Sequence, residues 1–325
     1  MNAGKPPFSS LKEMPIRPRR PGHGGYSRLR KWSGILFSLG FFGWCFYYLK
    51  QDPTRLMPLF HMQGKWMALL LGLQLTFYAC NGRIVQEMLR KLGLMLSVAE
   101  SFWLSILSSA ANTFLPMSSG VVFRTYYLKK YRGFSLTNSV SFLLRFYVLA
   151  YWIACWCGSI SSYILWSHGH SQLQLVGLLF LSGILVGGFL LCFFPKFSCF
   201  FETGRRIRLV ILAGVNQLLF AMMIWVAASA IDLAVSWEQA LFLSCLQYLT
   251  FLLPLTPGNI GVTEGILATG AHFIGIPASQ MIVVVLLLRG GALLVLLGLL
   301  PFSLYGLFRN EWRTSLREAT ENLKG

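Results

Sequence analysis

Six long apolar runs dominate this chain and restrict what it can fold into. They lie at residues 34–49, 66–82, 137–160, 173–194, 209–231 and 280–307. A helix needs about 20 mostly apolar residues to cross the hydrocarbon core of a bilayer. Hydrophobic residues make up 55% of the chain and charged residues only 12%, which excludes an ordinary soluble domain. We therefore expect an all-α integral membrane protein with about six full spans.

The polar ends of the chain flank one membrane domain. Residues 1–32 are basic and rich in Pro and Gly, and they are predicted to form a disordered cytoplasmic tail. Residues 33–308 form the polytopic membrane domain, and residues 309–325 form a short cytoplasmic C-terminal tail. No small-x-small cleavage site follows the run 34–49, so we expect it to be kept as the first span rather than removed as a signal peptide.

Two further apolar segments are interrupted near their middle. The first reads NTFLPMSSGVVFR from Asn112 to Arg124, and the second reads LTFLLPLTPGNIGVTEG from Leu249 to Gly265. Proline and glycine do not continue a regular helix. The interrupting residues include Pro116 and Gly120 in the first segment and Pro257, Gly258 and Gly261 in the second. A simple proline kink between packed helices is the alternative interpretation of each interruption.

The charges around these segments predict how each one enters the membrane. If residues 98–128 crossed once, the basic cluster of Lys129, Lys130 and Arg132 would lie outside, against the positive-inside rule. A re-entrant hairpin keeps the cluster inside. Residues 209–288 contain no lysine or arginine, so both flanks of the second segment belong outside. The chain thus predicts two re-entrant hairpins from opposite sides, and eight full spans are the alternative that fits the basic cluster less well.

An arginine follows each interrupted segment, deep in the next apolar run. Arg145 comes ten residues after Ser135, and Arg289 comes ten residues after Ser279. We expect each serine to begin a helix at a membrane surface. Ten residues rise about 15 Å, which is half the hydrocarbon thickness, so both arginines are predicted near the midplane. This arrangement is typical of inverted-topology repeats, here about residues 66–160 and 209–307.

Charged residues at the midplane make this region the candidate binding site, because intramembrane arginines are costly and usually functional. Arginine offers a planar fork of donors that matches phosphate, and free amides at the start of a half-helix also attract phosphate. Glu264 is expected to pair with an arginine in the empty site or to carry a proton. The candidate substrate-binding residues are Arg124, Arg145, Arg289, Glu264, Pro116, Gly120, Pro257, Gly258 and Gly261.

Each charged candidate also has a structural interpretation. Arg145 and Arg289 can pair with acids and fix helix packing. Glu264 can satisfy freed amides at a helix N-terminus. Arg124 can belong with Lys129 and Lys130 as a surface anchor.

Both interrupted segments resemble motifs of one membrane family. The sequence PLTPGNIGVTEG, from Pro254 to Gly265, is similar to the proline-glycine-glycine-leucine-glycine-x-x-glutamate-glycine signature of a flippase-like family typified by the transmembrane half of lysylphosphatidylglycerol synthase. The segment 112–124 resembles the upstream motif of that family, and the likeness covers roughly residues 35–310. The resemblance implies movement of a lipid or a lipid-linked headgroup between leaflets.

This chain departs from the family pattern in ways that leave the substrate open. Asn259 stands where a second glycine is usual, and Thr263 stands where arginine is common. Val121 replaces a frequent glutamate, and Ser118 and Ser119 replace a frequent arginine. Only a short tail follows residue 308, so we expect no aminoacyltransferase activity.

The sequence therefore favours a flippase or transporter for an anionic phospholipid or a polyprenyl-phosphate-linked headgroup. The alternative is a non-transporting lipid-binding partner of a glycosyltransferase or lipid-modifying membrane enzyme. Catalysis is the weakest interpretation, because no nucleophile, metal cluster or paired carboxylate accompanies Glu264. We expect no cofactor, no metal and no nucleic-acid partner. The expected location is a bacterial inner membrane, and the sequence leaves the lipid and the oligomeric state open.

Overall fold

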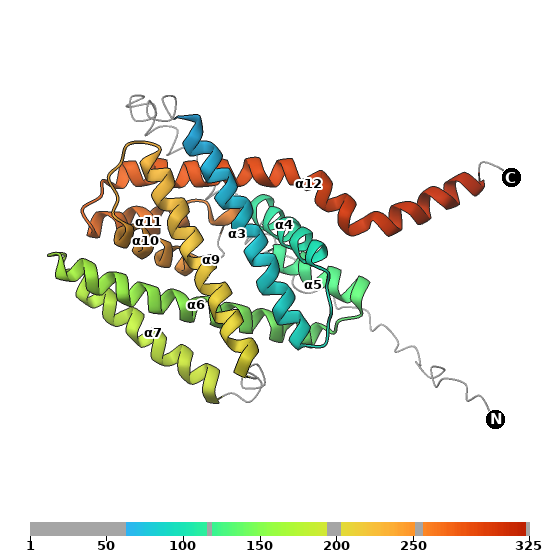
Figure 1. Cartoon of the computed structure of the whole chain (residues 1–325), viewed down its shortest axis with the longest axis horizontal. Coiled ribbons are helices and arrows are strands. Elements are labelled where there is room, and N and C mark those ends of the chain that lie inside the picture. The colour runs from blue at the N-terminus through green and yellow to red at the C-terminus, as the bar shows by residue number, and fades with distance from the viewer. Residues whose placement is uncertain (1–62, 116–118, 194–202, 251–255, 323–325) are drawn as a thin grey trace, which may run out of the picture.

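A computed structural model describes residues 63–115, 119–193, 203–250 and 256–322, and every regular element in these ranges is a helix (Figure 1). The predicted first span 34–49 and the N-terminal tail 1–32 lie outside the described residues. The elements are α3 (Gly64–Lys91), α4 (Val98–Phe114), α5 (Ser119–Arg132), α6 (Leu136–Ser167), α7 (Leu173–Phe193), α9 (Thr203–Ser229), α10 (Trp237–Thr250), the 3-10 turn η2 (Pro257–Asn259), α11 (Val262–Phe273) and α12 (Ala278–Asn322).

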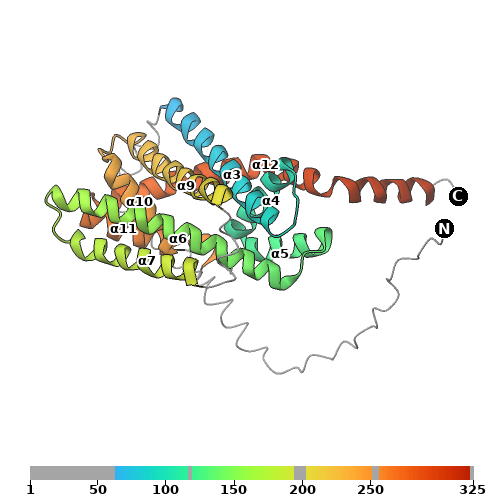
Figure 2. The same ribbon diagram turned by 60° about the horizontal axis from the view of Figure 1, so that its bottom comes forward.

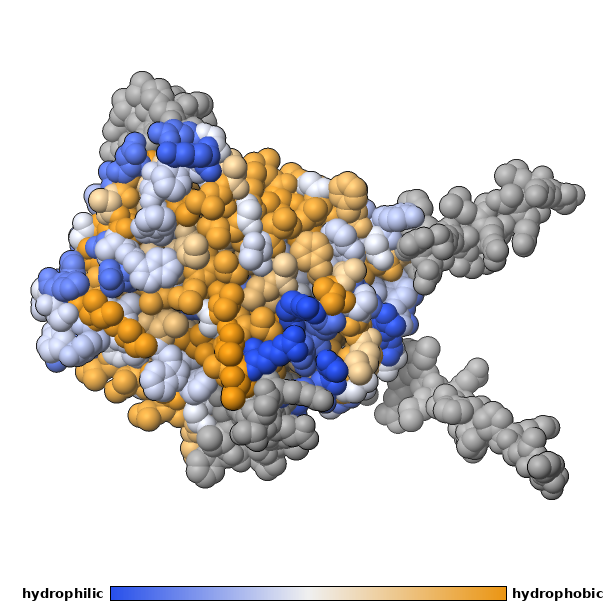
Figure 3. All heavy atoms as spheres, in the orientation of Figure 1, coloured by the Kyte–Doolittle hydropathy of each residue, from blue (hydrophilic) through white to orange (hydrophobic). Residues whose placement is uncertain are grey.

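Five of these helices, α3, α6, α7, α9 and α12, are long and apolar enough to cross a membrane. Large hydrophobic side chains such as Leu175, Leu179 and Leu185 on α7 are exposed, as lipid-facing side chains are. Figure 3 shows hydrophobic side chains over much of one face of the bundle. The prediction of an all-α integral membrane protein is confirmed.

The predicted helix starts are partly correct. Ser135 caps α6, because its hydroxyl accepts a hydrogen bond from the amide of Asn138 at 3.2 Å. Ser279 does not cap α12, which begins at Ala278, so this serine lies in the first turn. The position of each arginine within its span is little changed by this difference.

The first interrupted segment is a hairpin, in which α4 and α5 run antiparallel. Glu100 near the start of α4 forms an ion pair with Arg132 at the end of α5. At the other end, the amide of Gly120 donates to Asn112 Oδ1 at 2.7 Å. Both ends of the segment therefore lie on one side of the bundle, as a re-entrant hairpin requires, and a single crossing by this segment is excluded.

The second interrupted segment is built in the same way from α10, η2 and α11. At its base, Gln239 Nε2 donates to the carbonyl of Ile274 at 3.1 Å. At its tip, Asn259 Nδ2 donates to the carbonyl of Thr250 at 2.8 Å. This segment also returns to the side from which it entered.

The two hairpins enter from opposite sides, and their tips meet inside the bundle. Arg208 near the start of α9 lies 3.2 Å from Glu87 near the end of α3, which places both on the side of the first hairpin's base. Helix α9 then crosses to the other side, where the second hairpin begins. Gly258 at the second tip packs against the backbone of Thr113 at the first, so closely that a Cβ would lie 3.3 Å from the Thr113 carbonyl oxygen.

The order span, half-helix, half-helix, span therefore occurs twice, once from each side. It is formed by α3 to α6 and again by α9 to α12. Figures 1 and 2 show the additional span, α7, lying along α6. This order is that of the predicted inverted repeat.

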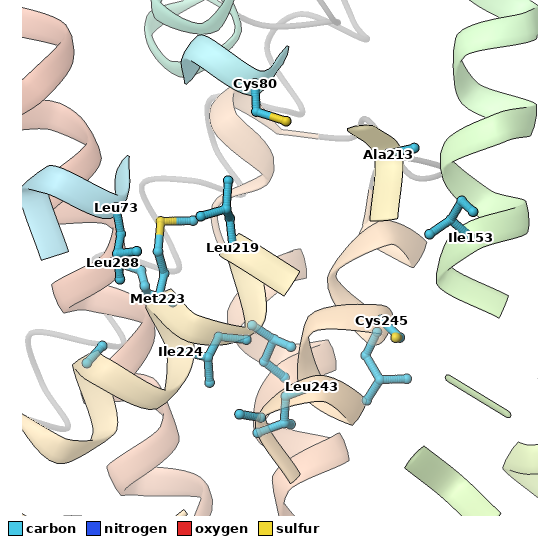
Figure 4. Packing of buried hydrophobic residues seen from close by; sticks show 14 of the residues in the cluster. Leu73, Cys80, Ile153, Ala213, Leu219, Met223, Ile224, Leu243, Cys245 and Leu288 are labelled. Carbon is cyan, nitrogen blue, oxygen red and sulfur yellow. The ribbon is translucent and has the colours of Figure 1, made fainter. Parts of the chain in front are cut away.

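An apolar core joins the two halves. Met223 and Ile224 on α9 and Leu243 on α10 are fully buried. Figure 4 shows Met223 beside Leu73 of α3 and Leu288 of α12, and Leu243 on the other side of Ile224. In a bilayer such contacts stabilise by close packing rather than by removal of apolar surface from water. The hairpin tips differ from this apolar core because they carry polar side chains.

Candidate functional site

A cavity of about 260 Å³ lies where the hairpin tips meet. Helices from both halves contribute to its wall, and Arg289 on α12 is the one charged residue among the described residues that line it. The polar lining residues are Gln74, Tyr78, Ser109, Asn112, Thr113, Tyr147, Gln247, Thr256, Asn259, Thr263 and Arg289. The cavity therefore offers many neutral hydrogen-bonding groups at membrane depth.

The guanidinium of Arg289 holds the tip of the second hairpin. Its Nε lies 2.5 Å from Oε1 of Glu264, its Nη1 donates to the carbonyl of Gly258 at 2.9 Å, and its Nη2 donates to the carbonyl of Asn259 at 3.2 Å. Glu264 also accepts a hydrogen bond from the amide of Gly261 at 2.7 Å. The pair is electrically neutral and connects α12, the tip and the start of α11.

Three left-handed residues allow the tip to present its carbonyls to Arg289. The φ angles are +57° at Gly258, +53° at Asn259 and +86° at Gly261. Glycine adopts this region freely, and asparagine is the side chain that tolerates it best. The departure from glycine at Asn259 is thus compatible with the turn, and its side chain adds the bond to Thr250.

A second cavity of about 170 Å³ lies beside the first, around Arg124 of α5. The two share the lining residues Phe77, Ser109, Asn112 and Tyr147. Arg124 Nε donates to Ser108 Oγ at 3.4 Å. No ion pair joins Arg124 to a carboxylate among the described residues, whose pairs are Arg132–Glu100, Arg208–Glu87 and Arg289–Glu264.

Several buried polar atoms around the cavities have no hydrogen-bond partner in the described part of the chain. Ser105 Oγ and Asn216 Oδ1 belong to residues that line the second cavity, and Gln247 Oε1 belongs to one that lines the first. Buried polar atoms in folded proteins are normally paired with protein or water. Their concentration here indicates a place for a polar ligand or water.

The base of the first hairpin carries an ionic cluster. Glu100 accepts hydrogen bonds from Tyr127 Oη at 2.9 Å and from Arg132 Nε at 2.8 Å. The hydrogen bond to the Glu100 carboxylate raises the pKa of Arg132, so this guanidinium stays charged. The cluster closes the hairpin at one membrane surface and does not line either cavity.

The structure brings together some of the predicted site residues and not others. Arg289, Gly258 and Glu264 meet at the tip, and Arg124 and Gly120 line the second cavity. Arg145 is half-buried on α6 and lines neither cavity. Pro116 lies outside the described residues, and Pro257 begins η2.

Two of the half-helix amides expected to attract phosphate already donate hydrogen bonds to side chains of the protein. The amide of Gly120 is bound by Asn112, and the amide of Gly261 is bound by Glu264. A free anion site at either helix start is therefore not formed by these amides.

Sequence reasoning missed the neutral lining residues. Asn112 was visible inside the first motif, and Gln74, Asn216 and Gln247 were visible as amides within apolar runs. Such amides are signals of polar contact at membrane depth, because each needs a partner there. Tyr147, which lines both cavities, carried no signal that separated it from other aromatic residues.

Comparison with known proteins identifies the family. Neither the search of curated proteins nor the search of solved structures found a match. The family model described as the lysylphosphatidylglycerol synthase TM region matches residues 32–300, a range that includes both hairpins and both cavities. The chain therefore belongs to the family of the lysylphosphatidylglycerol synthase TM region.

Proposed function

We propose that this protein moves an anionic phospholipid or a polyprenyl-phosphate-linked headgroup between the leaflets of the membrane. The observation that carries this proposal is Arg124, a cation that lines an interior cavity and forms no ion pair with a carboxylate in the described part of the chain. A phosphate that enters this cavity supplies the missing negative charge.

The physical reasoning concerns the barrier to crossing. A lipid crosses slowly because its charged phosphate must leave water for hydrocarbon. Arg124 and the neutral amides and hydroxyls of the two cavities replace part of that hydration. Hydrogen bonds to charged groups are worth about 1.5–3 kcal/mol, so one arginine accelerates crossing about 10- to 100-fold.

The hairpins supply the geometry that transport requires. They enter from opposite sides and meet at Thr113 and Gly258, so each cavity lies between elements anchored at opposite surfaces. In transporters with inverted repeats, relative movement of two such halves opens a central site to one side at a time. The Arg289–Glu264 pair keeps the second tip in place while the headgroup passes.

The remaining parts of the proposal follow from the same interpretation. The protein acts as a transporter and not as an enzyme, and its partner is a membrane lipid or lipid-linked substrate. It resides in a bacterial inner membrane with both termini in the cytoplasm, in agreement with the basic clusters at 1–32 and 129–132.

The test is leaflet exchange in proteoliposomes. Fluorophore-labelled anionic lipid is reconstituted with the full chain, and chemical quenching of the outer leaflet measures the exchange rate. We expect protein-dependent exchange that falls at least about tenfold in Arg124→Gln. Lys129→Gln is the matched control, because it removes one positive charge from an exposed position on the same helix.

Two results would contradict the proposal. One is exchange no faster than in protein-free liposomes for both phospholipid and polyprenyl-phosphate probes, which would favour the non-transporting partner. The other is an equal loss of exchange in Arg124→Gln and Lys129→Gln, which would assign the effect to surface charge.

A further inference from the structure

The first cavity, where the hairpin tips meet, has a wall in which the charge is already balanced. Arg289 is the one charged residue among its described lining residues, and each of its three guanidinium nitrogens contacts an oxygen of the second hairpin. An anion that enters finds this guanidinium bound to Glu264 and to two backbone carbonyls. A cation finds no aspartate or glutamate among the described lining residues. The wall therefore favours an uncharged ligand.

Side-chain amides and hydroxyls supply both donors and acceptors to this wall. Gln247 Oε1 is buried and has no hydrogen-bond partner in the described ranges, so it is left to accept from a ligand. Asn112 uses its Oδ1 to bind the amide of Gly120, which leaves its Nδ2 to donate. Thr263, 4% exposed, adds a hydroxyl that can do either. A ligand with several hydroxyl groups, each both a donor and an acceptor, matches this mixed set.

Aromatic rings line the same cavity and give it flat apolar surfaces. They belong to Phe77 and Tyr78 on α3, Tyr147 on α6 and Phe220 on α9. The ring of Phe77 has its centroid 5.9 Å from that of Tyr78 and 6.0 Å from that of Phe220. A sugar ring carries hydroxyls around its edge and C–H groups on its faces, so it matches amides and aromatic rings together. Water alone would satisfy the amides but would leave these rings without an apolar partner.

We infer that the first cavity binds an uncharged sugar residue that is attached to a lipid through a phosphate. The amides and hydroxyls of the wall bind the sugar hydroxyls, and the aromatic rings pack against the faces of the sugar ring. The inference rests on the proposed function for the lipid, and it names a polyprenyl-phosphate-linked sugar as the headgroup that is moved. The preference for a sugar is a binding property of this cavity and is measured without transport.

The test compares two synthetic short-chain polyprenyl phosphodiesters, one bearing glucose and one bearing a cyclohexyl group, which is a similar ring without hydroxyls. The full chain is purified in an amine-oxide detergent, because maltoside and glucoside detergents carry the group under test. We expect the glucose-bearing lipid to bind at least about tenfold more tightly, since a site that hydrogen-bonds hydroxyls rejects an analogue that lacks them. Methyl glucoside, a free sugar without a lipid, should bind more weakly than the glucose-bearing lipid.

Two variants each remove one hydrogen-bonding group of the wall. Gln247→Leu and Thr263→Val should each weaken binding of the glucose-bearing lipid about fivefold and leave binding of the cyclohexyl lipid unchanged. Thr263→Val nearly keeps the shape of the side chain, so its effect does not depend on repacking. Gln217→Leu is the matched control, because Gln217 is another buried glutamine whose Oε1 has no partner in the described ranges, and it lines neither cavity.

The outcomes separate this inference from the proposed function. Equal affinity for the two lipids, or equal effects of Gln247→Leu and Gln217→Leu, would overturn the sugar assignment. Methyl glucoside that binds as tightly as the glucose-bearing lipid would overturn the lipid-linked ligand in favour of a soluble sugar. Selective binding without leaflet exchange in proteoliposomes would refute transport and retain the sugar site. Leaflet exchange with equal affinity for the two lipids would retain transport and refute the sugar site.

Discussion

The ion pair between Arg289 and Glu264 predicts that removing either partner lowers the free energy of unfolding by a different amount, because a different charge is left unpaired in each case. In Arg289→Gln the carboxylate of Glu264, whose side chain is 2% exposed, loses its counter-charge. The carbonyls of Gly258 and Asn259 also lose their donors. Breaking a buried ion pair from one side costs about 3–5 kcal/mol, so we expect a loss of that size in the free energy of unfolding.

Removing the other partner should cost less. In Glu264→Gln the new amide oxygen still accepts from the amide of Gly261. Arg289, 24% exposed, keeps its bonds to two backbone carbonyls. We expect a loss of about 1.5–3 kcal/mol, the value of a hydrogen bond to a charged group. In the double variant no charge is left unpaired, so its loss should fall below the sum of the single losses by at least about 1 kcal/mol.

The assay is reversible unfolding of the purified protein by SDS in mixed micelles, followed by circular dichroism. The relative losses in the free energy of unfolding of the three variants decide the outcome. A larger loss in Glu264→Gln than in Arg289→Gln, or additive effects in the double variant, would show that the pair does not hold the tip.

Three further predictions concern the hairpins. A Cβ on Gly120 would clash with the carbonyl of Ser108 and with the side chain of Asn112, so Gly120→Ala should lower the free energy of unfolding by about 2 kcal/mol or more. The control is Gly214→Ala, at a helical position where a Cβ meets no atom within 4 Å, and this variant should be neutral or stabilising by up to about 1 kcal/mol. Glu100→Gln removes the carboxylate that binds Tyr127 and Arg132, and because Arg132 is 41% exposed the free energy of unfolding should fall by only about 1 kcal/mol. Amide hydrogen exchange in α5 should become faster, and exchange as slow as in the wild type would contradict a role for this cluster in closing the hairpin. In a cysteine-free background, Lys129→Cys and His168→Cys should react with an impermeant maleimide from opposite faces of the membrane, and labelling from one face would contradict the topology.

The hairpins were predictable from the sequence because charge restricts topology strongly. The cluster of Lys129, Lys130 and Arg132 decided between a hairpin and a crossing, and the structure has the hairpin. The absence of basic residues over 209–288 correctly predicted the side of the second hairpin relative to the first. These inferences need only the sign of a charge and the length of an apolar run.

The site was harder to predict because it depends on rotation and turn geometry. Arg145 and Tyr147 are two residues apart, so on a helix their side chains are about 160° apart and point to nearly opposite faces. Which of them faces the cavities depends on how α6 packs, and it is Tyr147. The bonds of Arg289 to the tip carbonyls depend on left-handed residues at 258 and 259, which set the direction of those carbonyls.

The two halves of the repeat use charge differently, and this difference predicts how two variants will diverge. Arg289 is neutralised and holds its own tip, whereas Arg124 lines a cavity without an ion pair to a carboxylate in the described ranges. An uncompensated charge at membrane depth destabilises the empty protein, so Arg124→Gln should keep or raise the free energy of unfolding, by up to about 2 kcal/mol, while it slows leaflet exchange. Arg289→Gln should lower both. If Arg124→Gln also lowered stability by several kcal/mol, Arg124 would be part of the framework, and the binding charge would have to come from another residue.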